Sequence, residues 1–413
     1  MAVFRKFKAF RPPADKAQKV AAFPYDVINS DEAREIADKN QESFIRIGKP
    51  EVDLPKDTDL YSEAVYNQAK KNLDDFIEKG LLVEDEKASY YLYSQTMDGR
   101  TQFGFVGCAS VDDYHNDVIK KHEYTRKAKE EDRCNHVRYT NAHTGPIFLT
   151  FRDNSILSEI IKKVSSDKPH TDIVAEDGVG HTVWVINDTD ISNQIESEFE
   201  KTKYLYVADG HHRSAAAAIV GKEREDSADK KDANAEYNYF LAVAFLASEL
   251  AIMDYNRVVK DLNGLSEEEF FEAIDENFSR GEAENPVSPS EKGEFGMYID
   301  GKWWVLHADE ELYPEDDPVK NLDVYVLQNY LLDKVLGIKD PRTDDRIDFV
   351  GGIRGLSELE RRVDSGEMKV AFSMYPTTIK ELMDIADSGN VMPPKSTWFE
   401  PKLRDGLFVH FLD

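Results

Sequence analysis

A short apolar run that ends in a glycine turn and continues as an alanine-rich stretch restricts the fold more than any other feature of this sequence. The run is Tyr204-Leu205-Tyr206-Val207-Ala208, the turn is Asp209-Gly210, and the alanine-rich stretch extends from Ser214 to Val220. An apolar run of this length favours a buried strand, and alanine is the strongest helix former. The segment therefore predicts a strand, a tight turn and a helix.

The rest of the chain has the same mixed character. Helices are expected at 31–39, with Ser30 as the N-cap, and at 62–79, 114–133, 155–164, 267–278, 324–336, 357–363 and 377–386. Strands are expected at 89–94, 101–110, 146–151, 181–186, 237–248, 345–350, 369–374 and 406–411, with a hairpin at 295–307. These elements predict an α+β class, that is, a mixed α/β fold.

The length predicts more than one compact region. The chain has 413 residues, and a single hydrophobic core stops growing at about 250–300 residues. Apolar residues make up 41% of the chain, which is enough to bury real cores and excludes disorder over most of the length. The texture changes near Asp261, so we expect one region over 1–260 and a C-terminal α/β region over 261–413, which returns to the site through 392–402.

Charge and cysteine content restrict the partners and the compartment. The 52 basic and 80 acidic residues leave a net charge of −28, which repels phosphate backbones and anionic lipid. No nucleic acid or membrane partner is therefore expected, and a homo-oligomer is left open. Two cysteines, Cys108 and Cys134, make neither a disulfide framework nor a metal site and are expected to be ordinary thiols. No apolar stretch has the length of a membrane span, so the chain is interpreted as cytoplasmic.

Four polar residues follow one another at the predicted turn, in Asp209-Gly210-His211-His212-Arg213. A glycine lets a ligand approach the backbone, and the following helix points free N–H groups at it, which is how proteins hold phosphates. A structural interpretation remains, in which Asp209 caps the helix, Arg213 forms a surface ion pair and one histidine is a core residue. Generic capping explains one polar residue here rather than four.

Metal binding at this turn is considered for two ions. Zinc is disfavoured because consecutive histidines diverge and no further cysteine or histidine follows three or four residues later. Magnesium held by Asp209 together with phosphate oxygens is the better prediction.

A basic stripe is predicted on the expected helix 114–133. His122, Arg126, Lys129 and Arg133 are spaced so that they would share one face of that helix. A cationic face in an acidic protein suits an anionic ligand, although charged helices are commonly just solvated. The nearby cluster of His136, Arg138 and His143 strengthens the anion interpretation.

Two further segments carry weaker signals. Pro393 and Pro394 stiffen a loop that presents Lys395, Ser396 and Thr397, a set that suits phosphate contacts but lacks the glycines of a Walker A loop. Near the N-terminus, Asp26 is a candidate base, or it simply closes a turn.

Several of these segments together resemble the bacterial and archaeal domain-of-unknown-function family 1015, and the resemblance covers essentially the whole chain. It rests on Phe4-Arg5, Pro24-Tyr25-Asp26-Val27, Lys121-His122-Glu123, Thr125-Arg126, Lys129-Glu130, Asp132-Arg133, Asp209-Gly210-His211-His212-Arg213, Tyr255-Asn256-Arg257 and Pro393-Pro394-Lys395-Ser396-Thr397-Trp398-Phe399.

The Asp209–Arg213 turn also resembles the phosphate-binding turn of the ParB/sulfiredoxin superfamily. That resemblance implies a ParB/sulfiredoxin-like core with an N-terminal extension over 1–260 and nucleotide phosphates held by Gly210, His211, His212 and Arg213. The cysteine of sulfiredoxins is absent, since Gly210 and His211 stand in its place, and the net charge disfavours ParB-type DNA clamping. The free serine kinases of the superfamily remain the best match.

We therefore expect a nucleotide-dependent phosphotransferase of serine metabolism, acting with ATP or ADP and Mg²⁺ on a small hydroxyl metabolite such as free serine. Alternatives are a phosphomonoester phosphatase that acts on a substrate like phosphoserine, and a non-catalytic sensor of nucleotides or phosphometabolites. The expected catalytic residues are Asp209, His212 and Asp26, with Asp209 also at the metal. The expected phosphate-binding residues are Gly210, His211, Arg213, His122, Arg126, Lys395, Ser396 and Thr397.

Overall fold

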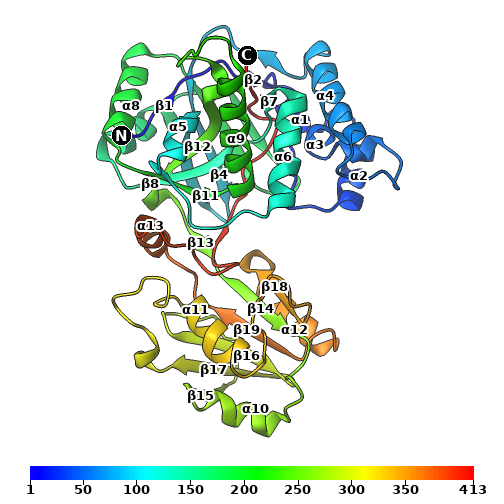
Figure 1. Ribbon diagram of the computed structural model, residues 1–413, viewed down its shortest axis with the longest axis vertical. Coiled ribbons are helices and arrows are strands. Elements are labelled where there is room, and N and C mark those ends of the chain that lie inside the picture. The colour runs from blue at the N-terminus through cyan, green and yellow to red at the C-terminus, as the bar shows by residue number, and fades with distance from the viewer. The chain divides into compact units, whose positions relative to one another are not determined.

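The computed structural model describes residues 1–413 and divides the chain into two compact units (Figure 1). Unit 1 contains Met1–Leu250 and Pro401–Asp413, and unit 2 contains Ala251–Glu400. The last 13 residues therefore belong with the first 250. The structure contains helices together with several sheets, in agreement with the α+β class expected from the sequence. None of the helices combines the length and the apolar character needed to cross a membrane.

Unit 1 is built on one sheet of nine strands. The strand order is β6-β11-β8-β12-β5-β4-β10-β9, and β1 pairs with β5 off this path. The strands are β1 (Phe4–Arg5), β4 (Tyr90–Met97), β5 (Arg100–Ser110), β6 (Ile119–Lys120), β8 (Ile147–Phe151), β9 (Thr171–Val174), β10 (Gly180–Ile186), β11 (Leu205–Asp209) and β12 (Tyr239–Leu246). The apolar run before the turn is thus a strand, as the sequence predicted.

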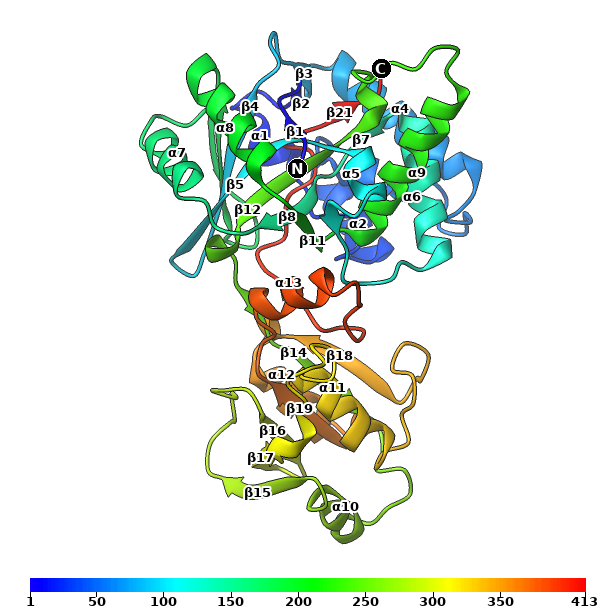
Figure 2. The ribbon, with the colours of Figure 1, turned by 60° about the vertical axis from the view of Figure 1, so that its left-hand side comes forward.

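Helices of unit 1 pack into the same apolar core as alternate residues of this sheet. The core joins the strands to α5 (Val111–His115), α7 (Ser155–Ser165), α8 (Thr189–Lys201) and α9 (His211–Ser227). Helix α6 (Lys127–Thr140) lies against α9, and α4 (Glu63–Glu78) lies against α6 (Figure 2). Both cysteines are buried free thiols.

The smaller elements of unit 1 include α1 (Ala17–Val20), α2 (Ser30–Lys39) and α3 (Ile45–Gly48). The strand pairs β2 (Phe10–Arg11) with β3 (Val83–Glu84), and β7 (Ala142–His143) with β21 (His410–Phe411), attach the N-terminal segment and the C-terminal segment to the unit. A 3-10 turn (Pro50–Asp53) follows α3, and another (Glu236–Asn238) precedes β12.

Unit 2 is built on a six-stranded sheet of order β15-β17-β16-β19-β14-β18. The strands are β14 (Tyr255–Val259), β15 (Phe278–Ala283), β16 (Glu294–Ile299), β17 (Lys302–Ala308), β18 (Ile347–Gly351) and β19 (Val370–Met374). Alternate residues of the sheet enter two cores, one with α10 (Glu267–Ile274) and α11 (Asp323–Leu327), the other with α12 (Leu356–Asp364). The remaining elements are α13 (Ile379–Asp387) and the pair β13 (Ile252–Met253) with β20 (Trp398–Phe399).

The expected helix 114–133 is wrong. Helix α5 ends at His115, and Asp117 adopts a left-handed backbone with φ 55°. The chain then forms β6, which pairs in parallel with β11, and a new helix begins only at Lys127. His122 and Arg126 therefore do not share a helix face with Lys129 and Arg133. A strand pairing that depends on a distant segment replaces the local helical preference here.

Other boundaries also differ. Asn29 rather than Ser30 caps α2, because its side chain accepts hydrogen bonds from the amides of Asp31 and Glu32. The alanine-rich helix extends beyond Val220 and ends at Ser227. The helix expected at 324–336 changes from α11 into a π-helix over Gln328–Asp333. Helix α8 and strand β14 were not among the elements expected from the sequence.

Candidate functional site

The Asp209–Arg213 turn has the geometry of a backbone cradle. Strand β11 ends at Asp209, Gly210 has φ 89° and ψ 33°, and α9 begins at His211. This left-handed backbone suits glycine and would strain any residue with a Cβ atom. Gly210 has no side chain that could cap α9, so the first amide groups of this 17-residue helix have no side-chain cap. Such a terminus attracts anions.

Asp209 is held in place by two donors. Its Oδ1 accepts a hydrogen bond from the Gly210 amide at 2.9 Å, and its Oδ2 accepts one from Lys402 Nζ at 3.2 Å. Burial favours the neutral acid, but the charges of Lys402 and Arg213 outweigh burial and lower the pKa of Asp209 to about 2. Asp209 is therefore a paired anion at neutral pH.

His211 and His122 form a buried pair at the start of α9. Their rings meet edge to face with centroids 4.5 Å apart. Both nitrogens of His122 and Nε2 of His211 are buried without a hydrogen-bond partner, and His211 Nδ1 lies 3.8 Å from Glu123 Oε2. Burial lowers the pKa of His211 to about 4 and that of His122 well below its usual value. These side chains are neutral donors and acceptors rather than the cations that a basic stripe requires.

His212 connects the starts of two helices. Its Nε2 accepts a hydrogen bond from the backbone amide of Arg126 at 3.1 Å, and Arg126 is the N-cap residue of α6. Burial lowers the pKa of His212, with the charge of Asp26 acting in the opposite direction and that of Lys129 lowering it further. The N-termini of α6 and α9 therefore meet at this imidazole, with the side chain of Arg126 exposed beside them.

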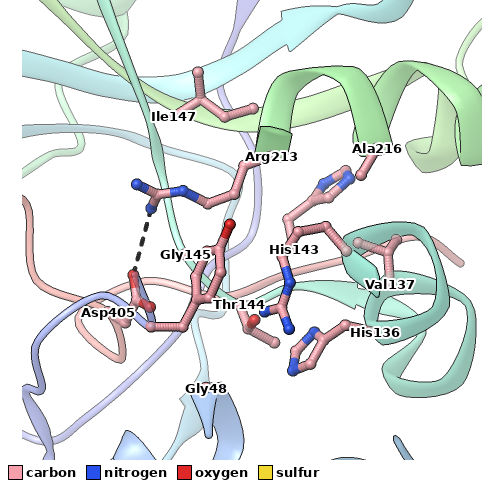
Figure 3. Close-up of a pocket in the computed structure, with 12 residues that line it drawn as sticks. Gly48, His136, Val137, His143, Thr144, Gly145, Ile147, Arg213, Ala216 and Asp405 are labelled. Carbon is pink, nitrogen blue, oxygen red and sulfur yellow. Dashed lines mark ion pairs between the residues drawn. The ribbon is translucent and has the colours of Figure 1, made fainter. Parts of the chain in front are cut away.

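Arg213 extends from the turn into a neighbouring cavity. Its Nη1 donates a hydrogen bond to the Pro146 carbonyl at 2.8 Å and lies 3.7 Å from Asp405 Oδ1 (Figure 3). A Cβ atom at position 210 would lie 3.3 Å from Arg213 Nε, so the guanidinium group folds back over the glycine. Burial lowers the pKa of Arg213, but the charges of Asp26, Asp405 and Asp209 raise it overall, so the group is always cationic.

The cavity beside Arg213 has a volume of 30 Å³. Five separate stretches of unit 1 contribute to its wall, at 25, 48, 133–147, 213–216 and 405, and the last is Asp405 of the C-terminal segment (Figure 3). The residues that line it are Tyr25, Gly48, Arg133, His136, Val137, His143, Thr144, Gly145, Ile147, Arg213, Ala216 and Asp405.

The other basic residues near α6 have partners of their own. Arg133 lies 4.0 Å from the centre of the Tyr25 ring and forms an ion pair with Asp132 at 2.8 Å. Arg138 forms ion pairs with Glu131 and Glu223, each at 2.7 Å.

Two of the histidines noted after the basic stripe are buried. His136 Nε2 lies 2.9 Å from the Ile47 carbonyl oxygen, and His143 Nδ1 lies 3.2 Å from His410 Nδ1. Burial lowers the pKa of His136 to about 4. These side chains fix the wall of the cavity rather than form a basic stripe.

The structure brings most of the predicted site residues together in unit 1, in different ways. His122, Asp209, His211 and His212 lie around the turn, Arg126 joins them through its backbone, and the charge of Asp26 acts on both His212 and Arg213. Arg213 is the one predicted site residue among those that line the cavity.

Lys395, Ser396 and Thr397 belong to unit 2. The backbone of Lys395 is left-handed with φ 61°, and its carbonyl accepts a hydrogen bond from Arg257 at 2.9 Å. Ser396 Oγ donates to the Pro393 carbonyl at 2.6 Å, and the Ser396 carbonyl accepts from Thr377 at 2.9 Å. These bonds shape the loop and leave the side chain of Lys395 exposed.

The donors at the turn do not make a resident metal site. Among residues 1–413 no group of three or more histidine, cysteine, aspartate or glutamate side chains is arranged to hold an ion. Both carboxylate oxygens of Asp209 already accept hydrogen bonds. Mg²⁺ usually takes one or two protein carboxylates together with substrate phosphates, so Mg²⁺ at Asp209 stays a prediction that requires the nucleotide.

Sequence reasoning missed the contributions of Lys402 and Asp405 to this site. Neither residue is among the predicted site residues. The contact between Lys402 and Asp209 joins residues that are 193 positions apart, so no local pattern marks it. The one available signal is the charged pair Arg404-Asp405 directly before a largely apolar run over 406–412.

Comparisons with known proteins give a family match and weak structural likenesses. The family model described as a protein of unknown function (DUF1015) matches residues 4–325. No curated protein matches the chain. A mutant free serine kinase in complex with AMP is 16% identical with a TM-score of 0.37, covering 72% of this chain and 90% of its own.

Two further solved structures show a likeness of the same order. A conserved hypothetical protein from Pyrococcus furiosus is 16% identical with a TM-score of 0.35, covering 73% of this chain and 94% of its own. SbnI from Staphylococcus aureus, with a C-terminal truncation, is 10% identical with a TM-score of 0.38, covering 74% of this chain and 87% of its own.

Proposed function

This chain belongs to the DUF1015 family, and from the geometry of its turn we propose that it is a nucleotide-dependent phosphotransferase acting on a small hydroxyl metabolite, with free serine as the first candidate. The observation that carries the proposal is the uncapped start of α9 after a left-handed Gly210, with the Arg213 guanidinium folded over the glycine. Backbone amides and a fixed cation converging on one point favour a phosphoryl group.

Phosphoryl transfer needs positioning and charge neutralisation more than covalent chemistry. The amides at His211 and His212 would hold phosphate oxygens, and Arg213 would neutralise charge that develops during transfer. His212 fixes the start of α6 beside that of α9, so amides of both helices face the same ligand. Lys402 holds the Asp209 carboxylate against the Gly210 amide and keeps the turn in shape.

The remaining predicted residues have narrower proposed roles. His122 and His211 are neutral, so they would contact a phosphate or base as hydrogen-bonding groups without adding charge. Arg126 is exposed at the start of α6 and would meet outer phosphates of ATP or ADP. Asp26 would orient the acceptor or a nucleotide-bound Mg²⁺, and Lys395, Ser396 and Thr397 of unit 2 stay predicted phosphate contacts. A ParB/sulfiredoxin-like ancestry of unit 1 also stays a prediction.

The test is an incubation of the protein with ATP or ADP, Mg²⁺ and a pool of hydroxyl metabolites that includes L-serine, followed by phosphorus NMR. A new phosphomonoester signal, lost in Gly210→Val, is the expected result. Release of inorganic phosphate from a phosphomonoester would instead identify a phosphatase. Nucleotide binding without any turnover would identify a sensor. Arg138→Met serves as the matched control, because Arg138 pairs with Glu131 and Glu223 on the outer faces of α6 and α9.

A further inference from the structure

The wall of the cavity contains a carboxyl group that the turn does not use. Asp405 is only 4% exposed, and its Oδ1 accepts no hydrogen bond. The Arg213 Nη1 atom at 3.7 Å is beyond hydrogen-bond distance. A buried acceptor without a donor is costly to the folded state. Proteins fill such places with a water molecule or a ligand group, and 30 Å³ is enough to hold a water molecule or a hydroxyl group.

The lack of a side chain at Gly145 keeps this place free for the carboxyl group. A Cβ atom at Gly145 would overlap Asp405 Oδ1, and a Cβ atom at Gly48 would lie 3.8 Å from Asp405 Oδ2. Neither glycine has a positive φ, so close approach rather than backbone conformation explains glycine at position 145. The carboxyl group thus lies against the backbone of the segment before β8, at a fixed position in the wall.

Arg213 connects the cavity to the turn. Its Nη1 lies on the side of Asp405, and its Nε lies 3.3 Å from the place of a Cβ atom at Gly210. Nε itself is buried without a partner. A phosphoryl group at the turn and an oxygen atom in the cavity would therefore contact the same guanidinium group, which would hold the two reactants next to each other.

The groups that face Asp405 come from several elements. Burial raises the pKa of Asp405 to about 7; the charge of Arg213 opposes this increase, and that of Asp26 adds to it. Arg133 and Arg404 also act on it, and both have other carboxylate partners, Asp132 and Asp177. The titratable side chains that share the cavity wall are Tyr25, His136 and His143, all neutral at pH 7.

We propose that this cavity holds the hydroxyl group of the acceptor, and that Asp405 is the catalytic residue that removes its proton. The catalytic role rests on the proposed phosphotransferase function, whereas the hydroxyl site does not. A hydroxyl group donates one hydrogen bond, which Oδ1 lacks, and accepts one, which Arg213 can donate. A carboxylate ligand is disfavoured because it would face the like charge of Asp405. An ammonium group is disfavoured because it would face the guanidinium groups of Arg133 and Arg213.

The reaction balances with the groups named. The hydroxyl oxygen forms a bond to the γ-phosphorus of ATP, and its proton moves to the Asp405 carboxylate. The bond between that phosphorus and the oxygen bridging to the β-phosphate breaks, and its electron pair leaves with ADP. Asp405 must be ionised to act, which its pKa allows at and above neutral pH.

The hydroxyl site is tested without any nucleotide. The amide resonance of Gly145 reports on the cavity while L-serine is compared with L-alanine, and ethanolamine with ethylamine, since each pair differs by one hydroxyl group. We expect the hydroxyl member of each pair to shift Gly145 and the other not to, and the shift to vanish in Asp405→Ala. Equal shifts within the pairs, or an unchanged shift in Asp405→Ala, would overturn the proposal. Asp177→Asn, which removes the partner of Arg404, is the matched control.

The catalytic role is tested by rate. Asp405→Asn keeps the shape of the side chain, so it should bind ADP within about 2-fold of wild type while phosphoryl transfer falls by about 10²–10⁴-fold. Wild-type kcat/KM should increase as pH rises through about 7, and the variant should lack that step. An unchanged rate, or an equal loss in Asp177→Asn, would overturn the role. A Gly145 shift without any transfer in wild type would overturn the proposed function and the catalytic role while supporting the hydroxyl site.

Discussion

Two carboxyl groups on either side of Arg213 show opposite behaviour. Asp209 has two hydrogen-bond donors, and its pKa falls to about 2 because Lys402 and Arg213 stabilise the anion against burial. Asp405 is buried without a donor on Oδ1, and its pKa rises to about 7. The same guanidinium group acts on both, so the difference lies in the other partners of each carboxyl group.

The comparison separates structure from chemistry within one site. A carboxylate that accepts a protein hydrogen bond on each oxygen is held in one position and keeps the turn in shape. A carboxyl group that lacks a donor and titrates near neutral pH has the properties of a group that exchanges a proton with a ligand. Asp209 accordingly holds the turn in shape, its role at Mg²⁺ stays a prediction, and we propose Asp405 for the reaction.

The largest effect is expected from Arg213→Met, which removes the group that both carboxylates share. Loss of one partner of a buried ion pair costs about 3–5 kcal/mol when the other charge stays; protonation of Asp405 should keep the loss near the lower limit at pH 6. Affinity for ADP should fall by about 100-fold or more. Calorimetric titration and urea denaturation measure the two quantities, and Arg213→Lys should restore little affinity, because a lysine lacks the planar fork.

Asp405→Asn should change how stability depends on pH. The folded state raises the pKa of Asp405 from its ordinary 3.8 to about 7, so the folded state binds this proton more tightly than the unfolded state does. The resulting stabilisation is full below about pH 4 and is lost as pH rises through 7, with a total on the order of 4 kcal/mol. Urea denaturation between pH 4 and 8 should show this decline in wild type and a flatter profile in the variant. An unchanged profile would contradict the account of Asp405.

Lys402→Met should act on the opposite side of the pH scale. Asp209 has a lowered pKa, so its contribution is present above pH 3.8 and is lost as pH falls through about 2. Removal of Lys402 should reduce that contribution by about 1–2 kcal/mol, a value discounted because the Asp209 side chain is 30% exposed. Denaturation at pH 3 and pH 6 measures the change. If Lys402→Met and Asp405→Asn changed the free energy of unfolding in the same pH range, the structural role given to Asp209 would be wrong.

Gly210→Ala should cost less stability but should weaken binding clearly. The positive φ of Gly210 strains any other residue by about 1 kcal/mol. The added methyl group would also lie 3.3 Å from Arg213 Nε and intrude on the cradle. Gly389→Ala offers a control with a positive φ and open space around it in unit 2. We expect Gly210→Ala and Gly389→Ala to lose similar stability and only Gly210→Ala to lose ADP affinity. That result would show that the loss of affinity does not come from backbone strain.

The smallest effect is expected in unit 2. Lys395 is exposed, so Lys395→Ala should change stability by less than about 0.5 kcal/mol. If its loop contacts a phosphate, ADP affinity should fall by about 3-fold at low salt and by less at high salt. Lys380→Ala, which removes an exposed lysine paired with Asp384 on α13, is the control. Identical affinities in the two variants would remove Lys395 from the site.

Local signals were enough to predict the turn. The apolar run of β11, the glycine and the alanines of α9 lie within 17 residues, and each has a strong preference of its own. The strand-turn-helix order could therefore be predicted from the sequence. The start of α6 could not, because β6 exists only through its pairing with β11.

Long-range contacts explain the rest of the site. Lys402 and Asp405 reach unit 1 because the chain leaves it at Leu250 and returns at Pro401, and no periodicity encodes that return. Charge was also overestimated from the sequence. His122 was placed in a cationic stripe, but burial keeps it neutral, as it does His211. A residue type therefore indicates a charge only once its burial is known.

We propose that the start of α9 binds nucleotide phosphate, and an ADP titration monitored by amide resonances measures this binding. We expect saturable shifts of the amides of His211, His212 and Lys127, the last at the start of α6, and we expect Gly210→Ala to weaken all three shifts. Saturable ADP binding that leaves these amides unmoved, or shifts confined to other segments, would contradict the claim.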